Sequence, residues 1–221
     1  MYSVDELEDR LIDLSFAEDI GDGDHTTLCC IPESAMGKSH LLIKEDGILA
    51  GVEVAKRVFA RFDPSLEVQV LIEDGSHVKK GDIAMIVSGK VRSLLQTERL
   101  MLNIMQRMSG IATTTNKYVE LLKGTKTHVL DTRKTTPGMR MLEKQAVKID
   151  HGGIDRIMLD NFSVDDTRKA VKMINGKYET ESSGGITFDT IRSYAECGVD
   201  FVSVGALTHS VKCLDMSFKA C

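Results

Sequence analysis

The chain has 221 residues, of which 42% are hydrophobic and 28% charged, and its formal net charge at pH 7 is -5. This composition is that of a globular protein and excludes collagen-like and intrinsically disordered classes. The net charge argues against nucleic-acid binding as the main function. No apolar run reaches the roughly 18 residues of a membrane span, and the N-terminus lacks the pattern of a signal peptide, so we expect a cytoplasmic protein that does not bind membranes.

An Asp-rich segment, DIGDGDHTT, follows a predicted first helix that starts with a capping box of Ser3 and Glu6 and ends before Gly21. A calcium loop in this segment is disfavoured because Thr27 stands where such a loop requires glycine. We therefore predict a capped turn. The five cysteines are odd in number and lack Cys-x-x-Cys spacing, so we expect reduced thiols that mostly serve as packing residues.

Short alternating runs between residues 38 and 88 are separated by Gly and Asp turns, which predicts an antiparallel sheet with one helix around 52–62. The segment DGSHVKKGD is similar to the turn of lipoyl-type and biotinyl-type modules. No lysine attachment motif follows it, so we predict a hairpin in a structural sheet.

A long helical run is predicted from about 91 to 122, with methionines and leucines at helical spacing. A methionine stripe of this kind is more often core or subunit interface than a cofactor site. Ser109 and Gly110 interrupt the run, and we predict that they divide it into two helices.

Four runs after Thr125 have the pattern of parallel strands: THVLDT, IDRIMLD, YETESS and DFVSVG. Helices are predicted at 164–174 and at 188–197, the second closed by Gly198. Strands and helices that alternate in steps of roughly 20 to 30 residues predict a parallel α/β sheet or barrel.

Polar residues follow each predicted strand, where parallel α/β proteins bind their ligands. Arg133 and Lys134 stand side by side in DTRKTTPG, a pair suited to carboxylate or phosphate. Asp160 ends the next strand and could contact sugar hydroxyls or Mg²⁺, although a helix-capping role, which Ser163 fits equally well, stays open. The last two strands end in SSGGIT and SVGALTHS, whose small residues let backbone N–H groups approach a phosphate. These residues predict a phosphorylated sugar substrate.

Five segments closely resemble the quinolinate phosphoribosyltransferase family: TERLMLNIMQRMSGIAT, VLDTRKTTPGMRMLEKQAV, RIMLDNF, ESSGGIT and GVDFVSVGALTHS. The match runs almost from end to end. It implies an N-terminal α/β sandwich domain with linking helices at 1–110. It also implies an incomplete, open α/β barrel at 111–221, whose C-terminal end can return to the first domain.

The resemblance implies a pentosyl-class glycosyltransferase of NAD biosynthesis, a carboxylating nicotinate-nucleotide diphosphorylase. With Mg²⁺, it converts quinolinate and phosphoribosyl pyrophosphate (PRPP) to nicotinate mononucleotide, pyrophosphate and CO₂. It implies a homodimer or higher homo-oligomer in which Arg99 enters the neighbouring active site. It assigns catalytic roles to Arg133, Lys134 and Asp160, with Asp160 also the metal ligand. The remaining substrate-binding positions that it implies are Thr132, Ser183, Gly184, Gly185, Ser203, Val204, Gly205 and His209.

The sequence departs from this family between EKQAVKI and GGIDRIMLDN, where Asp150 and His151 are joined directly. The family has an Asn-His-Arg segment, a strand ending in Lys-Asp-Asn-His and a strand ending in a catalytic-site glutamate here. Two βα units, roughly 50 to 60 residues, are therefore missing. Either the chain is a shortened, inactive homologue, or the sequence joins residues that flank a segment absent for other reasons. The second explanation is favoured because every other element looks intact.

Two alternatives to this enzyme stay open. A related phosphoribosyltransferase-like enzyme for another pyridine or pyrrole acid would share the fold and phosphate loops, although the intact DTRKTTPG argues against it. A catalytically inactive partner would persist through its oligomer interface, with the methionine-rich helix as contact surface.

Overall fold

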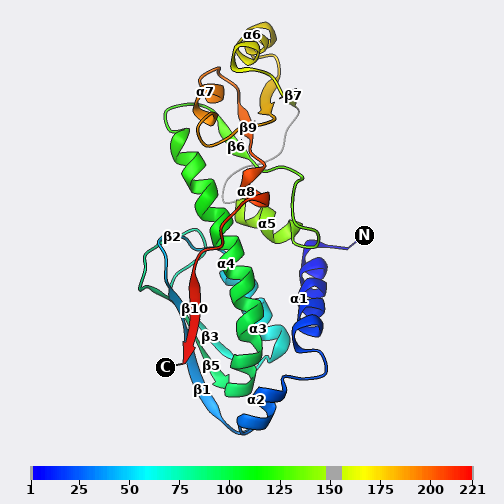
Figure 1. Cartoon of the computed structure of the whole chain (residues 1–221), viewed down its shortest axis with the longest axis vertical. Helices are drawn as coiled ribbons and strands as arrows, with labels where there is room; N and C mark the ends of the chain where they lie inside the picture. The colour runs from blue at the N-terminus through cyan, green and yellow to red at the C-terminus, as the bar shows by residue number, and fades with distance from the viewer. Residues whose placement is uncertain (1, 148–155, 221) are drawn as a thin grey trace. The chain divides into compact units, whose positions relative to one another are not determined.

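The computed structural model describes residues 2–147 and 156–220, and it divides the chain into two compact units (Figure 1). Unit 1 comprises Met1–Gly110 and Lys212–Cys221, and unit 2 comprises Ile111–Val211. The predicted junction at Asp150 and His151 lies outside the described residues.

Unit 1 is built around an antiparallel sheet of order β10-β1-β5-β3, as the alternating sequence runs predict. A second, two-stranded sheet pairs β2 with β4. Phe59 of α3 and Phe218 of β10 lie with ring centroids 6.0 Å apart, so α3 packs on the larger sheet. The elements are α1 (Val4–Ile20), α2 (His25–Cys30), β1 (Met36–Ile43), β2 (Gly47–Ile48), α3 (Val52–Phe62), β3 (Glu67–Val70), β4 (His77–Val78), β5 (Ile83–Lys90), α4 (Val91–Leu121) and β10 (Met216–Ala220).

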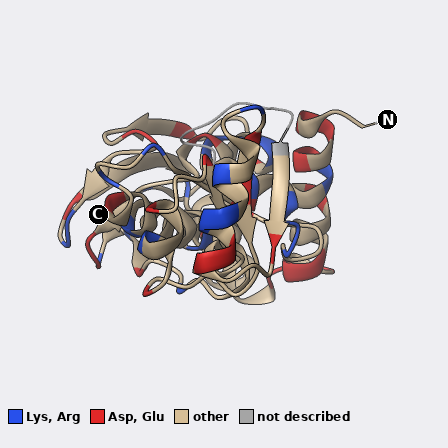
Figure 2. Ribbon diagram, turned by 90° about the horizontal axis from the view of Figure 1, so that it is seen from above, with Lys and Arg blue, Asp and Glu red and all other residues tan. Residues whose placement is uncertain are grey.

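The predicted capping box of α1 is confirmed. The Ser3 hydroxyl accepts a hydrogen bond from the Glu6 N–H, and the Glu6 carboxylate accepts one from the Ser3 N–H. Residues of both charge signs lie along α1, the helix nearest the N-terminus in Figure 2. Arg57 of α3 donates to Asp9 at 2.7 Å and to Asp5 at 3.1 Å, which fastens α1 to α3. The Asp-rich segment forms the predicted capped turn, with Asp24 accepting from the Thr27 N–H at the start of α2.

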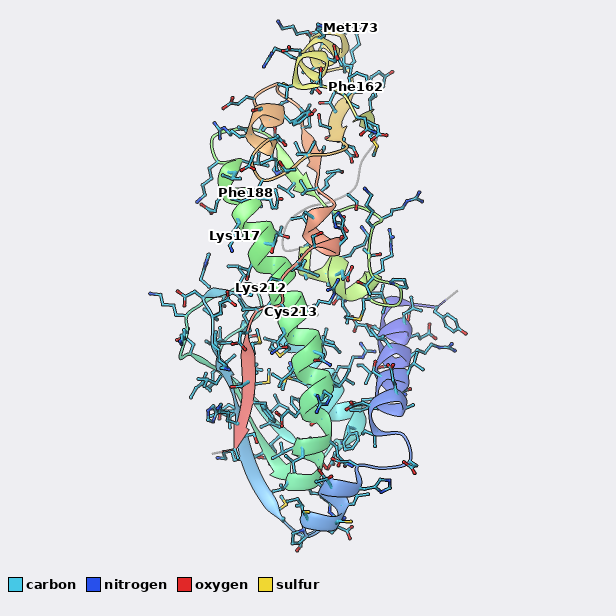
Figure 3. All side chains as sticks on the ribbon, viewed as in Figure 1. Lys117, Phe162, Met173, Phe188, Lys212 and Cys213 are labelled. Carbon is cyan, nitrogen blue, oxygen red and sulfur yellow. The ribbon has the colours of Figure 1, made fainter. Side chains whose placement is uncertain are left out.

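The predicted division of the long helix at Ser109 and Gly110 is wrong, because α4 runs unbroken from Val91 to Leu121. The Ser109 hydroxyl accepts from the Ala50 N–H and donates to the Ala50 carbonyl, so it serves a tertiary contact. A Cβ on Gly110 would lie 2.2 Å from the Lys212 carbonyl oxygen. The chain at Lys212 and Cys213 passes directly against α4 at this glycine (Figure 3). Both residues are therefore used for packing.

Unit 2 contains the predicted parallel sheet, of order β6-β9-β8-β7. The predicted helix at 164–174 is confirmed, whereas the helix predicted at 188–197 is shorter. Before it, the Thr187 N–H donates to the Thr190 hydroxyl in a local turn, so the helix begins only at Ile191. The elements are β6 (His128–Leu130), α5 (Arg140–Val147), β7 (Arg156–Asp160), α6 (Val164–Ile174), β8 (Glu179–Ser183), α7 (Ile191–Ala195), β9 (Phe201–Ser203) and α8 (Ala206–His209).

Strands β6 and β7 follow each other in the chain but lie at opposite edges of this sheet. In a closed βα barrel, successive strands are neighbours. The order β7-β8-β9-β6 is the order that remains when consecutive strands between β6 and β7 are removed. Among the described residues, each of these two strands has a strand partner on one side only. The sheet is therefore an open segment of a barrel, as predicted.

The two faces of the parallel sheet differ in chemistry. Val129, Leu159 and Val202 point to one face, where they join a buried apolar cluster with residues of α4 and α7. The alternate positions, such as Met158 and its register partner Glu181, line a cleft on the other face. This alternation follows from the period of two along a strand.

The four cysteines that the structure describes are free, but the expectation that the cysteines are mostly packing residues is wrong for three of these four. Cys29, Cys30 and Cys213 are exposed, and Cys197 is buried. Among the described residues, none of the helices combines the length and the apolar character that a membrane crossing requires.

We expect Gly110→Ala to lower the stability of the fold. Alanine is favoured over glycine by about 1 kcal/mol in a helix interior, but overpacking against the Lys212 carbonyl costs about 1–3 kcal/mol. The melting temperature should therefore fall in thermal unfolding monitored by circular dichroism. Lys117→Ala, on the exposed side of α4 (Figure 3), is the control and should leave it nearly unchanged. A stabilised Gly110→Ala variant would contradict the close packing.

Candidate functional site

An open cleft of about 970 Å³ lies at the C-terminal ends of the four parallel strands in unit 2. The loops that follow β6, β7, β8 and β9 all contribute to its lining. The predicted site residues that the structure brings together there are Thr132, Arg133, Lys134, Asp160, Ser183, Gly184, Gly185, Ser203, Gly205 and His209.

The loop after β6 carries the two exposed cations, Arg133 and Lys134. The Thr132 hydroxyl accepts from the Lys134 N–H at 3.1 Å. Two residues beyond, the N–H of Thr136 donates to the carboxylate of Glu143, a fully buried residue of α5, at 3.1 Å. Side-chain hydrogen bonds thus give the loop a defined backbone path beneath its cations.

A third cation in the cleft, Lys144 of α5, was missed by the sequence analysis. Its ammonium group lies 2.5 Å from the carboxylate of Asp131, which follows β6. Both residues line the cleft. The two residues belong to different elements, and no local pattern in the sequence indicates that they meet.

Asp160 stands at the end of β7 with its side chain exposed in the cleft. Its carboxylate forms no hydrogen bond or ion pair with the residues that the structure describes. The alternative capping role belongs to Ser163, which accepts from the Asp166 N–H at the start of α6. The Asp160 carboxylate is therefore available to a ligand.

The cleft offers one carboxylate that could hold a magnesium ion. Within the described residues, no cluster of three or more His, Cys, Asp or Glu side chains is placed to enclose a metal. Mg²⁺ in nucleotide and phosphate sites is usually held by one or two carboxylates together with water and phosphate oxygens. Asp160 is the carboxylate that can serve this purpose.

The loop after β8 presents two glycines in left-handed conformations, with φ of +101° at Gly184 and +62° at Gly185. A Cβ on Gly184 would lie 2.3 Å from the amide oxygen of Asn161, so this position excludes other residues. No described group accepts a hydrogen bond from the N–H of either glycine. These donors are available to an anion.

Asn161, also missed by the sequence analysis, continues the sheet beyond β7. Its N–H donates to the Ser183 carbonyl at 2.7 Å while its own φ is +58°. Asparagine adopts a positive φ more readily than most residues. An asparagine directly after a predicted strand is therefore the signal in the sequence that could have indicated this position. The contact aligns the ends of β7 and β8.

A buried polar pair lies at the base of the cleft. The Ser203 hydroxyl of β9 donates to the carboxylate of Glu181 on β8, which is only 6% exposed. A buried carboxylate requires such partners. Glu181 is not among the site residues predicted from the sequence, although an acidic residue inside a predicted buried strand is a usable signal.

The loop after β9 places Gly205 and His209 in the cleft, but not Val204. The Val204 side chain is fully buried in the apolar cluster, and its N–H donates to the Leu130 carbonyl at 3.0 Å. His209 Nδ1 hydrogen-bonds the Ser210 hydroxyl at 2.6 Å. Its Nε2 would lie 2.9 Å from a Cβ on Gly205, so the imidazole covers this glycine.

Arg99 belongs to unit 1, where it lines a separate cavity of about 420 Å³. Its side chain is 74% exposed, and its Nε lies 3.6 Å from an Asp19 carboxylate oxygen. Glu98 lines the same cavity, and burial raises the pKa of its carboxyl although the Arg99 charge opposes the shift. The guanidinium thus remains largely available to solvent.

Comparison with known proteins gives consistent matches to one family. The model of the N-terminal domain of quinolinate phosphoribosyl transferase matches residues 24–109, and that of the C-terminal domain matches 111–156 and 151–219. The chain is 34% identical to quinolinate phosphoribosyltransferase [decarboxylating] 1b of Nicotiana tabacum, over 95% of this chain and 81% of that protein. It is 32% identical to a probable nicotinate-nucleotide pyrophosphorylase [carboxylating] of Bacillus subtilis, over 94% of this chain and 91% of that one.

The fold is also that of solved relatives. The nicotinate-nucleotide pyrophosphorylase from Francisella tularensis has a TM-score of 0.90 and 33% identity, covering 100% of this chain and 98% of that chain.

The comparisons also locate a difference from the family. The tobacco alignment spans 285 positions and this chain has 221 residues, so at least 64 positions of that alignment have no counterpart here. The C-terminal model matches in two pieces that overlap at 151–156, and β7 begins at Arg156. The number of unmatched positions is somewhat larger than the roughly 50 to 60 residues predicted for two βα units. With both domains matched, the chain belongs to the quinolinate phosphoribosyl transferase family.

Proposed function

We propose that this chain catalyses the transfer of phosphoribose from PRPP to quinolinate, which yields nicotinate mononucleotide, pyrophosphate and CO₂. The observation that carries the proposal is the convergence of four strand-end loops on one cleft. They bring two exposed cations, a free carboxylate and unpaired glycine N–H groups to a single surface. This set matches a dicarboxylate and a phosphorylated sugar.

In this proposal, the cations after β6 bind the quinolinate carboxylates. The Arg133 guanidinium can form a bidentate pair with a carboxylate, and Lys134 supplies a point charge. On the other side of the cleft, the N–H groups of Gly184 and Gly185 are suited to the 5-phosphate, with Gly205 and His209 beside the same loops. The loop backbone at Lys134 is shaped by Thr132, whose hydroxyl accepts from the Lys134 N–H. Hydroxyl groups at the ends of β8 and β9 are supplied by Ser183 and Ser203.

The reaction then proceeds in two bond exchanges. The pyridine nitrogen forms a bond to ribose C1 while the bond from C1 to the pyrophosphate oxygen breaks, and the electron pair leaves with pyrophosphate. The ring carboxylate next to nitrogen then departs as CO₂, and a proton takes the electron pair left on carbon. Asp160 stabilises the positive charge that develops on the sugar, and the loop cations hold the ring in line.

Magnesium, when bound, would neutralise the pyrophosphate charge and thereby improve it as a leaving group. Asp160 would hold the ion together with oxygens of PRPP. The carboxylate of Asp131 is already paired with Lys144 and that of Glu181 with Ser203.

We also propose that the chain works in the cytoplasm as a homodimer or higher homo-oligomer in which Arg99 reaches the active site of a neighbouring copy. The support is its exposed guanidinium on a cavity-lining helix of unit 1. Light scattering after size-exclusion chromatography measures the oligomeric state.

A second candidate function is that of an inactive homologue that binds ligand or partner without turnover. It is favoured by the edges of β6 and β7 that have no strand partner among the described residues, and by the alignment positions of the tobacco relative that have no counterpart in this chain. The family residues predicted from that stretch include further cations and a glutamate, and loss of such groups can remove several kcal/mol of transition-state stabilisation.

The purified 221-residue chain distinguishes the two candidates. Formation of nicotinate mononucleotide from quinolinate and PRPP, followed by liquid chromatography, is the expected result for the enzyme. A folded protein that binds PRPP in calorimetry but forms no product would establish the second candidate and overturn the first. The same chain with a family segment inserted at the junction is the positive control.

We expect Lys134→Ala to weaken quinolinate binding by about 10- to 100-fold, because hydrogen bonds to charged groups are worth about 1.5–3 kcal/mol. Isothermal titration calorimetry measures the dissociation constant. Lys172→Ala is the matched control, since Lys172 is exposed on α6 and does not line the cleft. Equal affinities of the two variants would exclude Lys134 from the quinolinate site.

We expect Asp160→Asn to reduce the gain in PRPP affinity that Mg²⁺ provides by about tenfold, since a neutral amide is a weaker magnesium ligand. Calorimetry with and without Mg²⁺ gives this difference without any need for turnover. Asp165→Asn, on exposed α6, should retain the full gain. An unchanged magnesium effect in Asp160→Asn would contradict the metal role.

A further inference from the structure

Thr208, a residue of α8 with no assigned role so far, connects two loops of the cleft. It is fully buried, and its hydroxyl donates to the backbone carbonyl of Lys134 at 2.9 Å. The two residues are 74 positions apart in the chain. The bond therefore ties the loop after β9 to the loop that carries the cations.

A second contact acts on the side chain of the same lysine. A Cβ on Gly205 would lie 3.5 Å from Lys134 Cδ and 2.9 Å from His209 Nε2. The aliphatic part of Lys134 thus runs across the surface of Gly205, beside the imidazole. Its backbone is held by Thr208, and its side chain rests on the first residue of the same turn.

The position of β6 makes this support necessary. Among the described residues, β6 pairs with β9 alone and has no strand on its other side. A lysine on an edge loop has many rotamers, and ordering them costs conformational entropy. Contacts from the β9 side can reduce the number of accessible conformations before a ligand binds.

We propose that Thr208 is a positioning residue, which fixes the backbone at Lys134 so that its ammonium group faces the cleft. The inference deepens the proposed function and rests on it for the identity of the ligand, quinolinate. It does not rest on turnover, because ordering of the loop precedes chemistry.

A purely structural role for Thr208 is the competing explanation. Its hydroxyl also lies 3.4 Å from the Gly205 carbonyl, a local contact that threonines often make in helices. In that case, loss of the hydroxyl would affect the stability of unit 2 without a specific effect on the loop at Lys134.

The test compares Thr208→Val, which removes the hydroxyl at similar size, with Thr208→Ser, which retains it. Thr167→Val is the matched control, because Thr167 is also fully buried and its hydroxyl has no hydrogen-bond partner among the described residues. Hydrogen exchange is followed at the amides of Lys134, Thr135 and Thr136, all of which are hydrogen-bonded. Quinolinate affinity is measured by calorimetry.

We expect Thr208→Val to accelerate exchange at these amides and to weaken quinolinate binding, each by about fivefold, as the loss of one neutral hydrogen bond predicts. Thr208→Ser should keep the exchange rates and the quinolinate affinity of the unmodified chain, and Thr167→Val should change neither quantity. The proposal is overturned if Thr208→Val has the same exchange rates and quinolinate affinity as the unmodified chain. It is also overturned if exchange in Thr208→Ser is as fast as in Thr208→Val, or if Thr167→Val accelerates exchange at these amides equally.

The same measurements distinguish an error in the proposed function from an error in the role of Thr208. If the unmodified chain does not bind quinolinate, the ligand assignment is wrong, while the exchange rates still decide whether Thr208 orders the loop. If Thr208→Val does not fold, Thr208→Ala replaces it, since alanine also removes the hydroxyl that donates to the Lys134 carbonyl. Unchanged quinolinate affinity and loop exchange in Thr208→Ala would then overturn the proposal.

Discussion

Parallel pairing of β6, β9, β8 and β7 determines where the strand-end loops that line the cleft meet. In-register strands end along one edge, so Asp160 stands opposite Ser183, and Leu130 opposite Ser203. The loops that follow must therefore meet at that edge. The period of two along each strand separates an apolar face, packed on helices, from a face of mixed polarity that lines the cleft and carries Met158 beside Glu181.

This separation of faces explains how an open barrel segment can keep its apolar cluster buried. The apolar cluster, with Val129, Leu159 and Val202, lies on the face that α4 and α7 cover. The opposite face carries Glu181, Ser203 and Asp160, which tolerate water. An open sheet at β6 and β7 thus exposes two edges and a face of mixed polarity, which includes the half-exposed Met158, rather than the apolar cluster. The electrostatic cost is limited further because Asp131 and Glu181 each have a partner within the cleft.

The sequence predicted the parallel strands and α6 well because local patterns encode them: strand runs that end in Asp, Ser or Gly, and a Ser163 cap before α6. The break predicted at Ser109 and Gly110 was wrong, since propensity could not reveal that both residues serve contacts with distant parts of unit 1. Lys144 was missed for the same reason, because its pairing with Asp131 exists only in three dimensions. The motif resemblance identified most of the residues that line the cleft. It did not identify the contacts by which Thr208, Asn161 and Glu181 hold those residues in place.

The C-terminal strand β10 has a consequence for the order of folding during synthesis. It pairs with β1, which was made about 180 residues earlier, and β6 likewise waits for β9. Contacts so distant in sequence close slowly and leave strand edges unpaired meanwhile. The β1 and β6 edges therefore gain these partners only after β10 and β9 have been synthesised, and the nascent chain must keep both edges from other partners until then.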